Sequence, residues 1–504
     1  MKKKLLSVLL STAMVASLLA GCGAKEEAAP EATTEEAVEE EATEEATEEA
    51  VAEEEEAPAE DTNEVAEAET MEAPSTDGWD DSKDIYVYSW NDELGSRLAY
   101  IIGATDADGN TLTELPEGVT PTHPEYADFV HYVNLGCSGT DGTYQTAVDT
   151  AIESGAAEYP SLIAADNDVA KYYTEDDSKT IALSEIGITD GMYANAYQYT
   201  KDYATYNGAL KALTWQATPG NFTYRASIAK EVLGSDDPAT VQEAVKDWDS
   251  FFATADKMKE AGYKMISGPD DVKYAIWDQQ TQPWVTVAAD GSETLTLDSA
   301  VTDYFETAKK LYDGGYTDQT SMWSDGWSAN FEGDVFGYFG CTWFVYWCIA
   351  TTEDSETSTY GDWRVCEGPV GYHWGGTYVS VGKDTPNPEL AAYLVYALCC
   401  DTDVMYNIEA NTMDFVNNKE AVAKIIADGK GASDILGGQN PVETWAEAAT
   451  KIDLSNSSYL DSALKAIMDK ASEAYNAGTL DSADAAVQYV KDEVAKTYDY
   501  ITVE

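Results

Sequence analysis

The sequence predicts an α/β protein with two compact lobes behind a disordered acidic tether. Its 504 residues exceed what one hydrophobic core usually organises. From Asp84 onward, short β-rich runs alternate with longer amphipathic stretches, a pattern typical of α/β domains. Residues 22–83 are instead rich in Glu, Ala and Thr and hold almost no large apolar side chain, so we expect them to stay unfolded.

The first residues have the layout of an export signal. Met1 and three lysines precede an apolar run over residues 5–20, which is short for a membrane span. The string Leu19-Ala20-Gly21-Cys22 resembles the lipobox of bacterial lipoproteins. That resemblance implies a signal peptide over residues 1–21 and a lipid such as palmitate on Cys22, which would hold the protein outside the cell membrane on a Gram-positive surface. An ordinary secretory signal or a short membrane anchor is the alternative.

The charge of the chain restricts its ligand. Asp and Glu number 93 against 29 Lys and Arg, and the formal net charge is −64. The acidic tether explains only part of this charge, so the folded part is also negative. Such a surface repels nucleic acid, anionic lipid and polyanionic substrates. The composition therefore favours a neutral ligand.

Cysteine and histidine usage predicts neither a metal site nor a cofactor. The three histidines are far apart, and the cysteines lack paired Cys-x-x-Cys spacing. Buried free thiols and disulfides both remain open for the six cysteines that follow Cys22, which are Cys137, Cys341, Cys348, Cys366, Cys399 and Cys400.

The folded part begins with the elements of a parallel sheet. Residues 85–90, 129–135 and 161–165 are predicted as buried strands, and a helix is predicted over residues 143–155. Strand, helix and strand in this order predict a βαβ unit. Further amphipathic helices are predicted over residues 238–262, 299–313, 388–400, 459–477 and 483–500.

Four strings carry a family resemblance. They are YSWNDE at residues 88–93, LTWQATPGNFTYR at residues 213–225, GDVFGYFGCTW at residues 333–343, and the spaced Trp, Gly-Pro and Trp-Gly-Gly-Thr of residues 363–377. In this order they resemble the family 1 extracellular solute-binding proteins, the carbohydrate-binding lipoproteins of ABC importers, which are distantly related to maltose-binding protein. The resemblance spans nearly all of residues 84–504.

The resemblance implies a fold and a way of working. It implies the type II periplasmic-binding-protein-like fold, with a ligand cleft between one lobe at residues 84–212 plus 373–416 and another at residues 213–372 plus 417–504. A monomer of this kind binds a mono- or oligosaccharide and closes, and the permease subunits of an ABC transporter recognise the closed form. No catalysis is expected.

Some binding residues are predicted from ligand chemistry. A sugar ring offers a face of C–H groups and a rim of hydroxyls, which aromatic faces and planar polar side chains match. Asn91, Asp92 and Glu93 follow a strand end, where open α/β sheets bind ligands. The alternative for these three is a solvated acidic loop that caps a helix.

Other binding residues are implied by the family. Trp343 takes the place of the main stacking tryptophan, and Tyr224 that of a sugar-contacting tyrosine. Asp166 and Asp168 follow the third strand, where the family has a hydroxyl-binding acid, although the accompanying arginine is missing here. The remaining candidates lie near the crossovers and in a late loop, and they are Trp215, Gln216, Trp374, Gln439 and Trp445. Packing inside the fold is the alternative for most of these side chains.

Three other functions compete with this prediction. A secreted glycoside hydrolase also uses carboxyls and aromatics, but it needs two carboxyl groups across one bond. The chain has no Gly-x-Ser-x-Gly elbow, P-loop or His-Glu-x-x-His motif. A surface glycan-binding lipoprotein without a transporter would more often be a β-sandwich, which the long helices oppose. A two-lobed protein that binds peptides, amino acids or metals is the third alternative.

Overall fold

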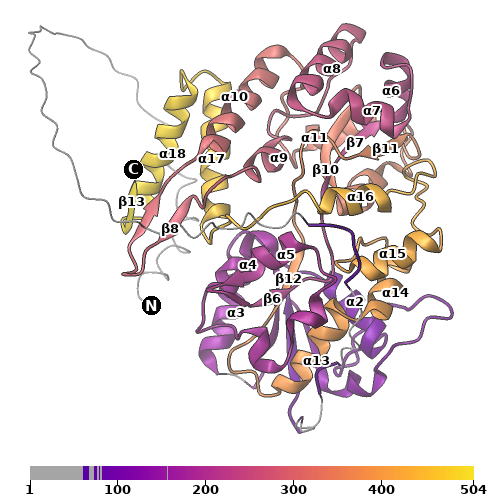
Figure 1. Cartoon of the computed structure of the whole chain (residues 1–504), viewed down its shortest axis with the longest axis vertical. Coiled ribbons are helices and arrows are strands. Elements are labelled where there is room, and N and C mark those ends of the chain that lie inside the picture. Colours follow the sequence, from indigo (N-terminus) through magenta and orange to yellow (C-terminus); the bar gives the residue numbers. More distant parts are fainter. Residues whose placement is uncertain (1–60, 67–72, 76–78, 80–81, 156, 504) are drawn as a thin grey trace, which may run out of the picture. The chain divides into compact units, whose positions relative to one another are not determined.

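The computed structural model describes residues 61–66, 73–75, 79, 82–155 and 157–503 (Figure 1). The predicted signal peptide, Cys22 and most of the predicted tether lie outside these residues. In the part that is described, no helix is both long and apolar enough to cross a membrane.

A five-stranded sheet with the order β2-β1-β3-β12-β6 organises the first lobe. β1 (Ile85–Ser89) pairs in parallel with β2 (Val130–Asn134) and with β3 (Pro160–Asp166), which confirms the predicted βαβ unit. β12 (Thr377–Val381) is antiparallel to β3 and to β6 (Ala212–Leu213). The helices associated with this sheet are α2 (Glu93–Ile102), α3 (Thr143–Ser154), α4 (Asn167–Thr174), α5 (Gln198–Ala204), α13 (Pro388–Cys399) and α14 (Thr402–Thr412).

An antiparallel sheet with the order β10-β7-β11 organises the second lobe. Its strands are β7 (Gly220–Arg225), β10 (Gly337–Cys341) and β11 (Trp363–Cys366). The remaining α-helices are α6 (Ala226–Val232), α7 (Pro238–Val245), α8 (Trp248–Ala261), α9 (Lys273–Trp277), α10 (Ser299–Gly314), α11 (Asp325–Ala329), α12 (Thr342–Trp347), α15 (Lys419–Ala427), α16 (Val442–Ala449), α17 (Asp461–Asn476) and α18 (Ala483–Thr497). One hydrophobic cluster packs the first sheet and continues into α11, α12, β10 and β11, while a second cluster packs β7 with α7, α8, α10, α17 and α18.

Short elements complete the fold. A small sheet has the order β13-β9-β8, and β4 pairs with β5. These strands are β4 (Thr205–Tyr206), β5 (Ala209–Leu210), β8 (Val285–Val287), β9 (Glu293–Leu295) and β13 (Ile501–Val503). The 3-10 helices span Pro124–Phe129, Leu183–Ile186, Asp190–Tyr193, Asn330–Glu332 and Ile349–Thr352.

Three segments connect the two lobes, and single β-bridges join these segments to one another. Residues 214–219 join β6 to β7, residues 367–376 join β11 to β12, and residues 413–418 lead from α14 to α15. Single β-bridges pair Gln216 with Val416 and Pro219 with His373. These crossovers therefore meet in one place, which we expect to be the pivot of any lobe movement.

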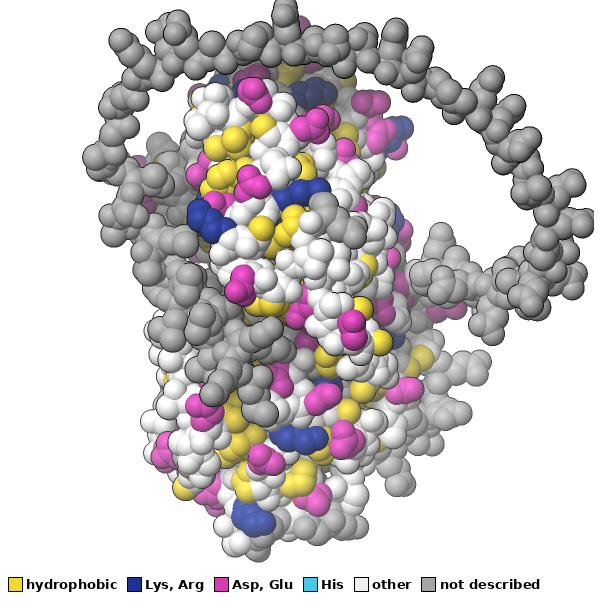
Figure 2. Space-filling view, turned by 90° about the vertical axis from the view of Figure 1, so that its left-hand side faces the viewer, with side chains coloured by type: hydrophobic (Ala, Val, Ile, Leu, Met, Phe, Trp, Pro, Cys, Tyr) yellow, Lys and Arg dark blue, Asp and Glu magenta, His cyan; other side chains and the backbone are white. Residues whose placement is uncertain are grey.

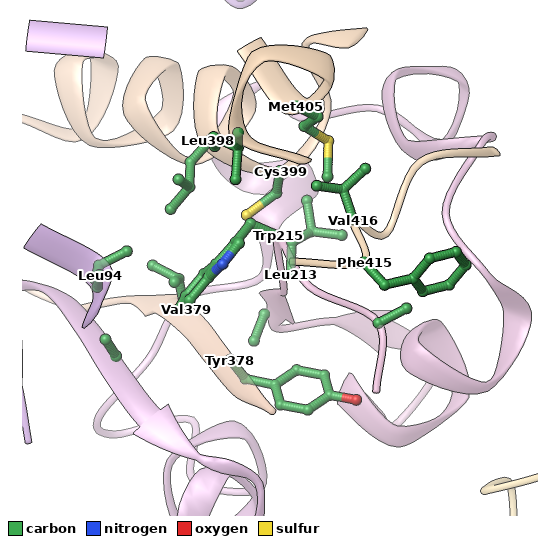
Figure 3. Close-up of a cluster of buried hydrophobic side chains, with 14 of the residues drawn as sticks. Leu94, Leu213, Trp215, Tyr378, Val379, Leu398, Cys399, Met405, Phe415 and Val416 are labelled. Carbon is green, nitrogen blue, oxygen red and sulfur yellow. The ribbon is translucent and has the colours of Figure 1, made fainter. Parts of the chain in front are cut away.

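Apolar side chains from both sides of the first sheet pack around the crossovers (Figure 3). Trp215 is fully buried among residues of β6, β12, α13 and α14, and its Nε1 donates to Asp414 at 3.0 Å. Nearby, the backbone N–H of Val416 donates to Glu409 at 3.4 Å. We call Trp215, Glu409, Phe415 and Val416 the crossover core.

One predicted helix is wrong in its extent. Residues 238–262 were expected to form a single helix, whereas the structure has α7 and then α8. The break falls at Asp247, which has an extended backbone and accepts the backbone N–H of Ser250 at 2.7 Å. An aspartate in this position caps a new helix instead of continuing the old one. The other predicted strands and helices are confirmed to within about three residues at each end.

The cysteines that lie in the described residues are free thiols, so of the two open alternatives the structure adopts this one. All except Cys137 are buried. Burial raises the pKa of Cys348 to about 12, which keeps such a thiol protonated and unreactive at neutral pH. On the surface, Asp and Glu side chains are scattered more densely than Lys and Arg over the face that Figure 2 shows.

Candidate functional site

Four aromatic side chains gather where the second lobe meets the crossovers. Trp343 lies at the start of α12, and its Nε1 donates to the backbone oxygen of Trp374 at 2.8 Å. The rings of these two tryptophans meet edge to face, with centroids 4.7 Å apart. Tyr274 stacks on Trp374 from the other side, at 5.1 Å and 24°. Together with Trp323, these residues form what we call the aromatic cluster.

Trp323 is the exposed member of the aromatic cluster. Its ring is nearly parallel to that of Trp343, with centroids 6.0 Å apart and an interplanar angle of 8°. The side chain is 58% exposed, although a large apolar ring would ordinarily be covered. Its backbone has φ +69°, in the left-handed region that disfavours bulky side chains. Strain and exposure together are typical of a residue kept for binding.

A group of polar side chains lies at the first-lobe side of the crossovers. Arg97 binds Asp414 through two hydrogen bonds of 2.6 and 2.7 Å. Glu93, at the start of α2, lies 3.9 Å from Arg97 and beside Gln216. Burial and then the charge of Asp414 raise the pKa of Glu93 to about 7, against the opposing effect of Arg97. Glu93 can therefore donate as well as accept a hydrogen bond near neutral pH.

Two further carboxyls follow β3. Asp166 caps α4 by accepting the backbone N–H of Asp168 at 2.9 Å. Burial and the neighbouring charge of Asp168 raise the pKa of Asp166 to about 7, and Glu93 adds to this rise. Burial and then Asp168 also raise the pKa of Tyr274. The carboxyls at the start of α4 are thus close enough to the aromatic cluster and to Glu93 for their charges to act on both.

Gly139 allows Trp90 to lie against Asp166. A Cβ atom at Gly139 would stand 3.0 Å from Cβ of Asp166 and 3.3 Å from the ring of Trp90, so any larger residue would push them apart. The Nε1 of Trp90 is buried, and no described residue accepts a hydrogen bond from it. This donor could serve a ligand oxygen.

Two hollows open along this region. One is small, with a cavity volume of about 10 Å³, and lies against the exposed side chains of Trp347 and Met413. Its wall consists of Gln216, Thr342, Trp343, Tyr346, Trp347, Thr412, Met413 and Asp414. The other has a similar volume of about 10 Å³ and lies between α4 and the start of α17, with Asp168, Lys171, His373, Asp461 and Lys465 in its wall. Nothing in the described part of the chain groups three or more metal-ligating side chains in a way that could hold a metal ion.

The structure brings several of the predicted site residues together. Glu93 lies beside Gln216, Asp166 caps α4 by accepting the backbone N–H of Asp168, and Trp343 contacts Trp374. Asn91 accepts the backbone N–H of Glu93 at 3.1 Å, while Asp92 is exposed and caps α2 without a side-chain hydrogen bond.

The structure places other predicted site residues inside the fold. Trp215 belongs to the crossover core. Tyr224 is fully buried, and its hydroxyl donates to the backbone oxygen of Asp236 at 3.0 Å. Gln439 both accepts from and donates to the backbone of Val365, at 2.9 and 2.8 Å. Trp445 is 2% exposed and packs against Tyr346 and Phe415.

Sequence reasoning missed Trp323, Tyr274, Asp414 and Trp90 as candidates. Trp90 lies within the YSWNDE string, so its place at a strand end was a usable signal. The other three come from segments far apart in sequence, and no local pattern marks them.

The sequence and the fold both have relatives. The sequence profile of the bacterial extracellular solute-binding proteins matches residues 132–424, and that of a protein family of unknown function matches residues 28–135. No curated protein matches the chain. Among solved structures, an extracellular solute-binding protein of family 1 has 17% sequence identity and a TM-score of 0.68 over 82% of this chain and 99% of that one.

Two bifidobacterial proteins are also similar in structure. One is the ABC transporter associated binding protein of B. animalis subsp. lactis in complex with β-1,6-galactobiose, with 19% identity and a TM-score of 0.60 over 84% of this chain and 99% of that one. The other is the galacto-N-biose-/lacto-N-biose I-binding protein of Bifidobacterium longum in complex with lacto-N-biose, with 14% identity and a TM-score of 0.59 over 84% and 98%. At these identities the likeness establishes the two-lobed α/β fold.

Proposed function

Because the chain belongs to the bacterial extracellular solute-binding proteins, we propose that it captures a neutral carbohydrate and delivers it unchanged to an ABC importer. The observation that carries this proposal is the exposed, strained Trp323 beside Trp343, close to carboxyls that match hydroxyl groups. Apolar ring faces next to groups that donate and accept are what a sugar needs.

The proposed contacts divide between the two lobes. Trp323 and Trp343 offer ring faces to the C–H side of a sugar, and Trp374 and Tyr274 hold them in place. The hydroxyl rim would meet Glu93, Asp166, Asp168 and Gln216, with Trp90 as a further donor. Trp215, Tyr224, Gln439 and Trp445 are left out of the proposed site because their side chains pack or pair inside the fold.

A neutral ligand fits the charges better than an anionic one. The only cation described beside Glu93 is Arg97, which is already bound to Asp414 in a bidentate pair. A sugar acid would therefore meet Glu93 and Asp166 with no free counter-charge beside them among the described residues, although Lys171 and Lys465 lie near Asp168, and like charges repel strongly where water is excluded. Two of the similar structures hold disaccharides, and Trp343, Tyr346 and Trp347 in the wall of one hollow would offer aromatic faces to more than one sugar ring.

Delivery would use lobe closure about the tied crossovers. Closure around a sugar would change the outer surface of the lobes, which we place at residues 84–212 plus 373–416 and 213–372 plus 417–504, and the permease would recognise that change. In the same proposal, a lipid on Cys22 holds the protein at the outer side of a Gram-positive membrane.

The proposal is tested first by thermal shift of the full chain against neutral oligosaccharides, sugar acids, amino acids and divalent metals. Only a ligand that binds the folded state raises the midpoint in a concentration-dependent way. We expect neutral sugars to do so and to be recovered unhydrolysed. A shift with amino acids or metals alone, or release of hydrolysis products, would overturn the proposal.

Calorimetry then tests the site. Trp343→Ala should weaken binding of the sugar found in this way by about 1–3 kcal/mol, because a stacking face is lost. Trp248→Ala is the matched control, since this partly buried tryptophan lies at the start of α8 against the other hydrophobic cluster. Unchanged affinity in a folded Trp343→Ala variant would remove Trp343 from the site.

A further inference from the structure

A short piece of the acidic N-terminal arm is bound to the folded body. Residues 61–66 belong to the stretch predicted as tether, yet Asp61 is only about one-eighth exposed. Its carboxylate pairs with the ammonium of Lys419, the first residue of α15, at 2.5 Å. The other carboxylate oxygen accepts the backbone N–H of Gln198 at 2.8 Å. Five residues further on, the backbone N–H of Ala66 donates to Asn195 at 2.9 Å.

These contacts satisfy groups that the body leaves unmatched. Gln198 begins α5, and the preceding residue, Tyr197, makes no side-chain capping hydrogen bond. Asp61, which is far from α5 in the sequence, therefore provides the hydrogen-bond acceptor that the first turn of this helix requires. Lys419 is 7% exposed, and a buried ammonium without a partner is strongly unfavourable.

Two lysines lie where Asp61 binds, although Asp202 and Asp190 are also near Lys201. Lys201 lies on α5 near Lys419, and burial followed by the charge of Lys419 lowers the pKa of Lys201. Asp61 acts in the opposite direction on the same group. The ring of Tyr197 adds to the attraction, because the Lys419 ammonium lies 5.3 Å from its centroid. Two lysines and an aromatic ring thus form a surface suited to a carboxylate.

The two parts that Asp61 joins are already held together without it. The backbone N–H of Tyr197 donates to the Asn417 side chain at 2.9 Å, and the backbone N–H of Lys419 donates to Asn195 at 2.8 Å. Asn417 is also the crossover residue whose backbone N–H donates to Trp215. The segments that receive Asp61 are therefore joined to each other directly beside the crossovers.

We propose that residues 61–66 form a docking clip that attaches the acidic N-terminal arm to the surface of α5 and α15, with the Asp61–Lys419 ion pair as its main contact. Asp61 itself is then fixed beside the crossovers, at a distance along the chain from the start of β1. A pull on the arm would reach α5 and α15 first. This inference goes beyond the proposed function and does not depend on the ligand.

Hydrogen exchange followed by mass spectrometry on the full chain tests the clip. Asp61→Ala removes both carboxylate contacts, and we expect the amides of residues 62–66 and of the start of α5 to exchange at least about tenfold faster. Lys419→Met should have the same effect on residues 62–66. Glu64→Ala is the matched control, since Glu64 lies in the same segment with an exposed side chain, and it should leave exchange unchanged.

Two results would overturn the proposal. Exchange of residues 62–66 that is equally fast in the wild-type chain and in Asp61→Ala would mean that the segment is not docked through Asp61. Equal acceleration by Glu64→Ala would mean that the general charge of the arm, and not the Asp61–Lys419 pair, holds it. Near-ultraviolet circular dichroism establishes that each variant remains folded, and no sugar is needed for any of these measurements.

Discussion

The crossover core and the aromatic cluster both depend on tryptophan, yet they use it in opposite ways. Trp215 is fully buried and its N–H is satisfied by Asp414. Trp323 leaves 58% of its side chain exposed on a left-handed backbone. A buried indole with a bonded N–H contributes stability, whereas an exposed indole on a strained backbone costs stability and is best explained by binding. The surroundings of a tryptophan, and not its residue type, therefore distinguish a core residue from one that binds a ligand.

The largest expected effect is on the stability of the crossover core. Trp215→Ala should lower the free energy of unfolding by about 3–5 kcal/mol, because it opens a large cavity and takes a hydrogen bond from Asp414. Urea denaturation of both proteins measures this change. The same substitution at Trp347, which is 63% exposed, should change stability by no more than about 0.5 kcal/mol. Equal losses at the two positions would mean that Trp215 is not a core residue.

The second effect concerns a buried carboxyl of the crossover core. Burial raises the pKa of Glu409 to about 8 from its ordinary value of 4.5, the charge of Asp414 adds to the rise, and the N–H of Val416 opposes it. Between these two values the unfolded chain has lost the Glu409 proton while the folded chain keeps it. The stability that this proton contributes is therefore lost as pH rises from about 4.5 to about 8.

Glu409→Gln should remove that pH dependence. We expect the variant to gain stability relative to the wild-type chain as pH rises, by on the order of 2 kcal/mol at pH 8.5, and we expect no such gain near pH 4.5. Urea denaturation across this pH range measures the difference. Glu443→Gln, on the exposed face of α16, serves as the control. Parallel pH profiles for Glu409→Gln and the wild-type chain would contradict the assignment of Glu409 as a buried, protonated acid.

Periodicity in the sequence predicts only some elements of the two regions, and not their exposure. The helix ending at Cys399 follows from an apolar run, whereas the strands around Trp215, β6 and β12, were not predicted. Trp215 and Trp343 each follow a strand, so their patterns do not distinguish a core residue from a cluster residue. Trp323 has a left-handed backbone but is neither Gly nor Asn, the residue types that usually indicate one in a sequence. Tyr274 and Trp374 are in contact although one hundred residues separate them in the sequence. Likewise, the composition around Asp61 predicts a free tether, because nothing local indicates Lys419 as its partner.

The smallest effects separate strain from stacking at Trp323. Trp323→Ala removes the ring but keeps a Cβ atom at φ +69°, whereas Trp323→Gly removes both. Relief of a left-handed backbone is worth about 1–2 kcal/mol, and the extra freedom of glycine in the unfolded chain costs about 0.4–1 kcal/mol. The glycine variant should therefore be more stable than the alanine variant by about 0.5 kcal/mol in urea denaturation.

Both variants should bind the sugar about fivefold more weakly than the wild-type chain in calorimetry, because each lacks the same ring face. An alanine variant at least as stable as the glycine variant would show that the backbone of Trp323 is not strained. Wild-type affinity in both variants would show that Trp323 does not bind the sugar, and Trp323 would then differ from Trp215 only in its burial.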